Sequence, residues 1–254
     1  MTDSCQSNAL ISLDEALAKI HTSISAVNGE ETVCLHQALG RVVVEDCSAP
    51  FSLPAFPNSA MDGYAFNSAD IKNAPFKLLQ AGTSRAGHPF SGKLLSGQCI
   101  RIFTGAVIPS GADSVIMQEF VDHSDHVIHF PENTQAKQNV RYVGEDVKQH
   151  DCLLAAPKQL SAIDLGLLAS AGIYEVKVKR KLRIAFFSTG DELRAIGSPL
   201  AAGQIYDSNR YSLTALLKNP CHEVTDLGVI TDDKERIQQC LLTAAQNHDV
   251  IIST

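Results

Sequence analysis

The sequence predicts a multidomain protein in which an all-β unit and a parallel-sheet α/β unit are joined by helical segments. Helical periodicity marks the beginning of the chain and returns near residue 161. Short apolar runs fill the stretch between, and strands alternate with helices beyond residue 181. This alternation indicates βαβ units with right-handed crossovers. We therefore predict a helical linker domain in two segments, an inserted all-β domain and the N-terminal part of an α/β domain, at residues 1–49 with 139–178, 50–138 and 179–254.

Length and composition fit this organisation. The 254 residues suffice for about two domains of roughly 150 residues each. No apolar run approaches the roughly 20 residues that span a bilayer, so we expect no membrane association. The formal net charge of −7 leaves no basic stripe, which makes nucleic acid an unexpected partner. The polar residues Met1 to Asn8 carry no leader signature, and the seven cysteines show no Cys-x-x-Cys spacing, so we expect a cytoplasmic protein with reduced thiols.

Two helices are predicted in the linker segments. The first begins with a capping box, Ser12 with Glu15, and should end near Asn28-Gly29. Its apolar face is formed by Leu13, Ala16, Leu17, Ile20, Ile24 and Val27. The second begins at Ser161 and stops at Gly172.

The predicted β unit contains four apolar runs with strand character, bounded by turn residues. They are Phe76–Leu79, Cys99–Phe103, Ser114–Met117 and His126–Phe130. The series His123, His126 and His129 suggests a metal site, but a spacing of three follows neither face of a strand. We therefore expect solvated hairpin histidines.

The α/β unit should contain three parallel strands and two helices. The strands are Leu182–Ser188, Glu223–Ile230 and Val250–Ser253, and the helices are near Arg210–Lys218 and Lys234–Gln246. Three strands are few for a doubly wound domain, so we expect that the sequence is part of a longer protein.

The most informative stretch is Asn58–Ala65, NSAMDGYA, which follows a loop stiffened by prolines. Asp62 stands between Met61 and Gly63, where it would be presented at a loop tip. One interpretation is a functional carboxylate; the alternative is an Asx turn in which Asp62 bonds its own backbone.

Ligands of open parallel sheets bind at the carboxyl ends of the strands. The first strand ends in Ser188, Thr189 and Gly190, small residues that let backbone amides approach an anion, and Asp191 and Glu192 follow. This combination suits phosphate plus a divalent metal. The alternative is that Asp191 and Glu192 open a helix and complement its dipole.

Further polar loops admit both functional and local roles. Asp207 can cap a helix and contact a ligand, and after the second strand we favour Asp232 as functional and Asp233 as a cap. Thr104 and Asp146 lie in loops whose alternatives are turn chemistry and an exposed ion pair with Arg141.

Taken in order, five motifs resemble those of the molybdopterin molybdenumtransferase (MoeA) family, which is related to the gephyrin E domain. They are NSAMDGYA, RIFTGAVIPSGAD at Arg101–Asp113, Gly144-Glu145-Asp146, STGDEL at Ser188–Leu193 and GQIYDSN at Gly203–Asn209. The resemblance implies a cytosolic homodimer that takes adenylylated molybdopterin and molybdate, inserts the metal with Mg²⁺ and releases AMP. It also implies the predicted domains, the last of them a molybdopterin-binding, MogA-like domain, a further C-terminal β-barrel absent from this sequence, and an adenylyltransferase-type partner.

The resemblance also implies roles for individual residues. The catalytic candidates are Glu192, Asp62 and Asp146. The cofactor-binding candidates are Thr104, Ser188, Thr189, Gly190, Asp207, Asp232 and Ser253, and the Mg²⁺ candidates are Asp191 and Glu192. Because Asp62 and Asp146 lie outside the α/β domain, we expect a site that closes across the dimer.

Two alternative functions stay open at this point. A non-catalytic dimeric scaffold of the same fold would have no use for the retained acids Asp62, Asp146, Asp191 and Glu192. A molybdopterin adenylyltransferase shares only the α/β domain, and residues 1–178 argue against it. We do not expect the 254 residues alone to catalyse molybdenum insertion.

Overall fold

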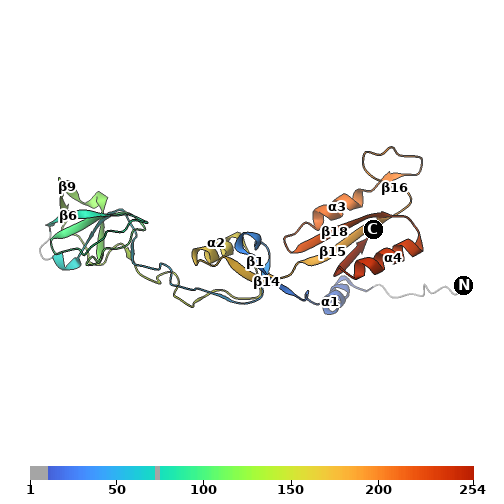
Figure 1. Cartoon of the computed structure of the whole chain (residues 1–254), viewed down its shortest axis with the longest axis horizontal. Helices are drawn as coiled ribbons and strands as arrows, with labels where there is room; N and C mark the ends of the chain where they lie inside the picture. The colour runs from blue at the N-terminus through green and yellow to red at the C-terminus, as the bar shows by residue number, and fades with distance from the viewer. Residues whose placement is uncertain (1–10, 72–74) are drawn as a thin grey trace. The chain divides into compact units, whose positions relative to one another are not determined.

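The computed structural model describes residues 11–71 and 75–254 (Figure 1). Two units can be distinguished. The first consists of Met1–Glu45, Ala156–Gly166 and Ile173–Thr254, and the second of Asp46–Ala155 and Leu167–Gly172. Helix α2 (Ala162–Ser170) contains one boundary between them, after Gly166. The division into a linker, an inserted and an α/β domain at the predicted residue limits stays a prediction.

The second unit is built on a six-stranded sheet in the order β8-β5-β7-β6-β10-β9. Its strands are β5 (Gly63–Phe66), β6 (Phe76–Ser84), β7 (Gln98–Ile102), β8 (Ser114–Met117), β9 (Asp122–Ser124) and β10 (Val127–Phe130). Neighbouring strands are antiparallel except for the parallel pair β6 and β7. Two short 3₁₀ helices, η2 (Ser68–Asp70) and η3 (Gln118–Phe120), accompany the sheet.

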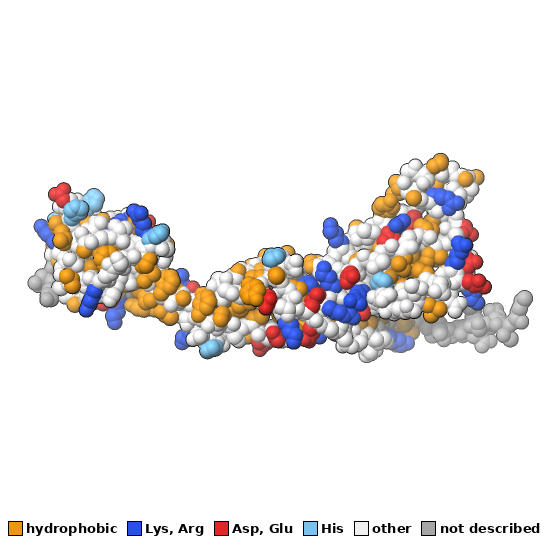
Figure 2. Space-filling view, viewed as in Figure 1, with side chains coloured by type: hydrophobic (Ala, Val, Ile, Leu, Met, Phe, Trp, Pro, Cys, Tyr) orange, Lys and Arg blue, Asp and Glu red, His pale blue; other side chains and the backbone are white. Residues whose placement is uncertain are grey.

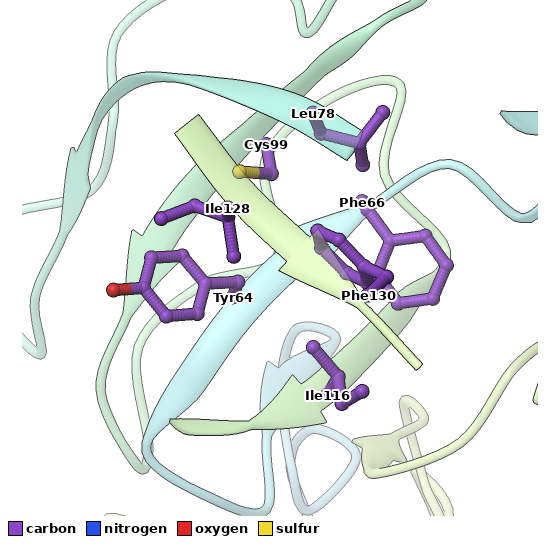
Figure 3. Close-up of a cluster of buried hydrophobic side chains, with 7 residues drawn as sticks. All are labelled: Tyr64, Phe66, Leu78, Cys99, Ile116, Ile128 and Phe130. Atoms are coloured by element: carbon purple, nitrogen blue, oxygen red, sulfur yellow. The ribbon is translucent and has the colours of Figure 1, made fainter. Parts of the chain in front are cut away.

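Both faces of the central strands are buried, because successive side chains of a strand point to opposite faces. Tyr64 and Phe66 of β5 belong to one hydrophobic cluster, and Ala65 between them belongs to the other. The first cluster contains Tyr64, Phe66, Leu78, Cys99, Ile116, Ile128 and Phe130 (Figure 3). Within it the rings of Phe66 and Phe130 meet edge to face at 5.0 Å between centroids.

The chain enters and leaves this sheet through two segments that pair with each other. Strand β3 (Cys47–Ser48) is antiparallel to β12 (Cys152–Leu154), and β4 (Asn58–Ser59) is antiparallel to β11 (Val140–Arg141). Between them an antiparallel bridge joins Leu53 and Val147. We call these segments, residues 47–59 and 140–154, the two-stranded ribbon. Its two strands run side by side in Figure 1.

In the first unit, a four-stranded sheet has the order β1-β14-β2-β13. Its strands are β1 (Glu30–Cys34), β2 (Val42–Val43), β13 (Lys158–Gln159) and β14 (Glu175–Lys179), and the 3₁₀ helix η1 (Leu35–Gln37) follows β1. Arg41 is buried against this sheet, where it pairs with Glu31 and donates to the carbonyl of Lys179 at 2.6 Å.

The same unit carries a three-stranded parallel sheet in the order β18-β15-β19. The strands β15 (Leu182–Thr189), β18 (His222–Ile230) and β19 (Val250–Ser253) alternate with the helices α3 (Ser208–Leu216) and α4 (Lys234–Ala245). The short strands β16 (Leu193–Arg194) and β17 (Ile205–Tyr206) form a separate parallel pair. The parallel βαβ organisation predicted from the sequence is therefore present.

Two sequence expectations need correction. Helix α1 (Leu13–Ser23) has the expected capping box but ends five residues before the predicted stop at Asn28. The hydroxyls of Thr22 and Ser23 donate to the carbonyl of Lys19, and Thr22 also donates to that of Ala18. Carbonyls of the last turn therefore accept from side chains of the same turn. Glu192 opens no helix, because a turn and then β16 follow β15.

Several apolar side chains of the first unit are exposed. No residue of α1 is buried, and the apolar face predicted for it, including Leu13, Leu17 and Ile20, is open. Val224 and Val229 of β18 are partly exposed, and hydrophobic side chains are visible over this part of the molecule in Figure 2. Within residues 11–71 and 75–254, no helix has both the length and the apolar character needed to cross a bilayer.

Candidate functional site

The second unit brings together two predicted site residues that are 42 positions apart. Asp62 lies in the turn between β4 and β5, and Thr104 lies just after β7. Asp62 Oδ1 accepts hydrogen bonds from Thr104 N at 2.7 Å and from Thr104 Oγ1 at 2.9 Å. Asp62 is therefore not the residue of an Asx turn, because its carboxylate binds a distant loop.

Backbone contacts hold the two loops in this position. Ser59 is 1% exposed, and its backbone exchanges hydrogen bonds with the loop after Thr104: Ser59 N donates to Ala106 O at 3.0 Å and Gly105 N donates to Ser59 O at 2.8 Å. The Ser59 hydroxyl donates to the carbonyl of Met61 at 2.6 Å. A buried serine thus shapes the turn that presents Asp62.

The environment of Asp62 favours its ionised form. The backbone N–H and the hydroxyl of Thr104 both donate to the carboxylate, and the guanidinium of Arg101 adds an attractive charge, so the pKa of Asp62 lies below its usual value. A carboxylate with a lowered pKa is a poor proton acceptor at neutral pH. Asp62 is suited to act as a fixed negative charge or a hydrogen-bond acceptor.

Asp146, the other acidic candidate in this unit, is engaged in an exposed ion pair. Arg141 Nη2 contacts Asp146 Oδ2, and Arg141 Nε lies 3.8 Å from Glu145 Oε1. Asp146 N donates to Leu53 O at 3.0 Å, which joins the two segments of the two-stranded ribbon. The ion pair considered from the sequence is therefore formed.

In the α/β sheet, four predicted positions meet at the carboxyl edge. Ser253 of β19 lies opposite Phe187 of β15, next to Ser188 and Thr189. Thr189 N and Oγ1 both donate to Thr254 O, at 2.7 and 3.2 Å, and Gly190 N donates to Ile230 O at 3.2 Å. The ends of all three parallel strands are joined here, where an open α/β sheet binds its ligand.

Glu192 folds back over Gly190. A methyl group placed on Gly190 would lie 2.5 Å from Glu192 Oε2 and 2.8 Å from Oε1, so the carboxylate occupies the space that glycine leaves. Gly190 has φ of +145°, which L side chains rarely adopt. Next to it, Asp232 N lies 3.4 Å from Asp191 Oδ1, which connects the loops after β15 and β18.

Asp207 is the most buried of the predicted site residues with a charge, at 4% exposure. It caps α3 through Oδ1, which accepts from Arg210 N at 3.1 Å. Its second oxygen, Oδ2, is buried and has no hydrogen-bond partner in the described part of the chain. Burying a carboxylate oxygen without a partner costs free energy, so this atom could accept a donor from a ligand.

The implied Mg²⁺ needs oxygen ligands, and the acidic residues of the described chain could supply few of them together. Among the residues that the structure describes, no group of three or more His, Cys, Asp or Glu side chains could hold a metal ion. The histidines of the β9–β10 hairpin therefore form no such group either. Mg²⁺ is often held by only one or two carboxylates together with substrate phosphates and water. Asp191 and Glu192, next to Gly190, are the carboxylates that would hold such an ion.

Two residues without a predicted role, Arg101 and Gln118, contact the Asp62 loop. Arg101 donates to the carbonyls of Gly63 and Ile102, both at 2.8 Å, and to the side chain of Gln118. Gln118 N donates to Asp62 O at 3.1 Å. In the sequence, the feature that could have indicated a role for Arg101 is its position in the RIFTGA motif, three residues before Thr104.

The chain is similar to known proteins along nearly its whole length. The family model described as the MoeA N-terminal region (domain I and II) matches residues 11–172, and the model of a probable molybdopterin binding domain matches residues 185–254. These two matches cover the unit that presents Asp62 and the parallel sheet that presents Glu192. The chain belongs to the MoeA family.

Individual relatives support this assignment. A molybdopterin molybdenumtransferase of Haemophilus influenzae is 41% identical over 96% of this chain and 61% of the relative. One from Nostoc sp. is 36% identical over 88% of this chain and 52% of the relative. The crystal structure of the molybdopterin biosynthesis MoeA protein of Pyrococcus horikoshii OT3 matches with a TM-score of 0.85 and 32% identity, covering 96% of this chain and 66% of that chain. The chain thus spans less than two thirds of the length of these curated relatives.

Proposed function

We propose that the protein containing this chain inserts molybdate into adenylylated molybdopterin and releases AMP. The observation that carries the proposal is the convergence of two separate motifs, in which Thr104 holds the Asp62 carboxylate by two hydrogen bonds. Packing does not require this pair, since Thr104 is exposed and Asp62 lies at a turn. The names of the relatives supply the reaction class.

The parallel sheet supplies the groups for an anionic substrate. The carboxyl ends of β15 and β19 carry Ser188, Thr189 and Ser253, and the Glu192 carboxylate lies over Gly190 beside them. The unpartnered Asp207 Oδ2 would accept a hydrogen bond from a donor group of the pterin. We propose that Asp232, which lines an open groove along α4, extends this binding edge.

Glu192 and Asp191 would hold Mg²⁺ in this proposal. A phosphate that approaches Gly190 arrives beside the Glu192 carboxylate, and two anions at this spacing repel each other. Bound Mg²⁺ would neutralise this repulsion and polarise the phosphorus whose bond to AMP is broken. Asp62, ionised at neutral pH, would orient a donor group of the substrate and would not remove a proton.

We further propose that the functional protein is a homodimer in which Asp62 of one copy and Glu192 of the other serve one site. The exposed apolar face of α1 supports association, because a single copy leaves Leu13, Leu17 and Ile20 open to water. Mixing inactive Asp62→Asn and Glu192→Gln copies should restore part of the activity. If exchange of copies is demonstrated and no activity returns, the two residues act from the same copy.

The experiment that tests the function joins residues 1–254 to the remaining C-terminal part of the Haemophilus influenzae relative. This chimera is supplied with adenylylated molybdopterin, molybdate and Mg²⁺, and AMP release is measured. We expect release that depends on molybdate, and its loss in the Glu192→Gln variant. The matched control is Glu235→Gln, an exposed glutamate in the first turn of α4, which should leave the rate unchanged. A folded chimera that releases no AMP would contradict the proposal.

A further inference from the structure

Arg101 is the side chain that connects the two halves of the Asp62–Thr104 pair. It lies in β7 directly opposite Tyr64 of β5, so it belongs to the strand that leads into Thr104 and faces the strand that follows Asp62. Among the described residues, Arg101 forms no ion pair. Its hydrogen bonds go to carbonyl oxygens and to an amide instead.

These bonds fix the backbone on both sides of the pair. Arg101 Nη1 donates to Gly63 O, the carbonyl directly after Asp62, and to Ile102 O, two residues before Thr104. One guanidinium nitrogen therefore spans the two loops whose side chains meet. The planar guanidinium offers several donors in a fixed geometry, which a lysine cannot reproduce.

A third contact closes the arrangement through Gln118. Arg101 Nη2 donates to Gln118 Oε1, and the backbone N–H of Gln118 donates to Asp62 O. The main-chain carbonyl of Asp62 is thus held by the same residue that anchors the guanidinium. Arg101 thus binds Gly63 O directly, and its partner Gln118 binds Asp62 O.

Aromatic rings hold the guanidinium in place. The Arg101 guanidinium carbon lies 4.5 Å from the ring centroid of Phe103 and 5.4 Å from that of Tyr64. Phe103 is the residue immediately before Thr104, so the ring contact fixes the approach to the threonine. Arg85 also lies over the Phe103 ring, at 5.7 Å, but its side chain has no hydrogen bond among the described residues.

We infer that Arg101 is the positioning residue of this site: its guanidinium holds the Asp62 and Thr104 loops together and so fixes the Asp62 carboxylate for the substrate. The inference rests on the proposed function only for the identity of that substrate. The positive charge of Arg101 also contributes to the lowered pKa of Asp62, after the two hydrogen bonds from Thr104.

The first test measures the pKa of Asp62 in the 254-residue chain by carboxyl ¹³C NMR, with Asp62→Asn to assign the signal. In Arg101→Met the methionine keeps the contact with both rings but removes the charge and the donors, so the Asp62 pKa should rise and exchange of the Thr104 N–H should accelerate. Arg85→Met removes the other cation over Phe103 and should change neither. An unchanged Asp62 pKa and Thr104 exchange in Arg101→Met would overturn the inference.

A second variant decides the matter if Arg101→Met does not fold. Arg101→Lys keeps the charge and the aliphatic stem but cannot donate to Gly63 O, Ile102 O and Gln118 at once. We expect faster exchange of the Thr104 N–H in this variant. Exchange as slow as in the unaltered chain would overturn the positioning role.

The activity readout separates this inference from the proposed function. In the chimera, Arg101→Lys should lower kcat by on the order of 100-fold with little change in KM, because the fixed groups are misplaced while the binding edge is intact. A variant with unchanged kcat overturns the role of Arg101. If the chimera with unaltered Arg101 releases no AMP, the proposed function fails, and the NMR measurements still decide whether Arg101 positions Asp62.

Discussion

Gly63→Ala should disrupt the sheet that presents Asp62. Gly63 begins β5 and lies between Ile102 of β7 and Met117 of β8. A methyl group on Gly63 would overlap the carbonyl oxygen of Ile116 and lie 2.8 Å from its carbonyl carbon and 3.1 Å from Met117 Cα. Carbon atoms in contact prefer about 3.5–4.0 Å, and the carbonyl oxygen lies closer still, so β8 would have to move by more than about 1 Å.

The cost can be estimated from this displacement. Overpacking a close contact costs about 1–3 kcal/mol. The obstructing atoms are backbone and cannot rotate away, so the adjacent hydrogen bonds between β5 and β8 also weaken, each worth about 0.5–1.5 kcal/mol. We therefore expect a loss of at least about 3 kcal/mol in the free energy of unfolding of the second unit.

Two glycine variants serve as controls. Gly97 also lies in this unit and has φ of +80° but open space around it, so Gly97→Ala should cost only about 1–2 kcal/mol for the backbone conformation. Gly166 lies inside α2 with open space and without a positive φ, so Gly166→Ala should stabilise by about 0.5–1 kcal/mol.

Native-state hydrogen exchange in increasing urea is the suitable assay, because it reports each unit separately. Peptides from β5 and β8 report the second unit, and peptides from β15 report the first. We expect Gly63→Ala to lower protection of β5 and β8 and to leave β15 unchanged. A loss in Gly63→Ala no larger than that in Gly97→Ala would refute the steric argument.

Three further predictions concern the first unit. Lys158 and the Ser161 amide lower the pKa of Asp164 from 3.8 to about 2. The ionised carboxylate therefore stabilises the fold fully above pH 3.8, and this stabilisation is lost as the pH falls through about 2. In thermal melts at several pH values, the stability difference between the unaltered chain and Asp164→Asn should shrink over that range. Gly190→Ala should displace the Glu192 carboxylate and cost about 1–3 kcal/mol, and an unmoved Glu192 carboxyl NMR signal would contradict it. Arg180→Met removes both hydrogen bonds to Asp249 and should accelerate amide exchange in β19, which Asp249 precedes. Exchange equal to that of the unaltered chain would show that the pair is dispensable.

The sequence predicted best where a segment is long and periodic. The three parallel strands lie within one or two residues of their predicted positions, because each apolar run is bounded by clear turn and capping residues. Two-residue strands such as β4 and β11 were not predicted, since two residues carry no periodicity. The predicted end of α1 was wrong. Apolar spacing continues through Ile24 and Val27, but the hydroxyls of Thr22 and Ser23 bind carbonyls of the last turn, where the helix ends.

The sequence predicted the carboxylates of the candidate site but not the residues that hold them in position. Asp62 and Thr104 each stand in a motif, yet nothing local states that their side chains meet. The partners of Arg101 are 38 residues away at Gly63 and 17 residues away at Gln118, so only the paired strands reveal them. Contacts that depend on strand register lie beyond what a single sequence indicates.

The two-stranded ribbon contains both chain segments that connect the six-stranded sheet to the rest of the polypeptide. Because β3 and β12 already hold the two crossing segments together, residues added between them lengthen a loop that is closed at its base. Doubling such a loop costs only about 0.6 kcal/mol in chain entropy. A reporter peptide spliced into the exposed turn at Asp125–His126 should therefore leave the melting of the parallel sheet unaltered, which makes this turn a practical site for labels.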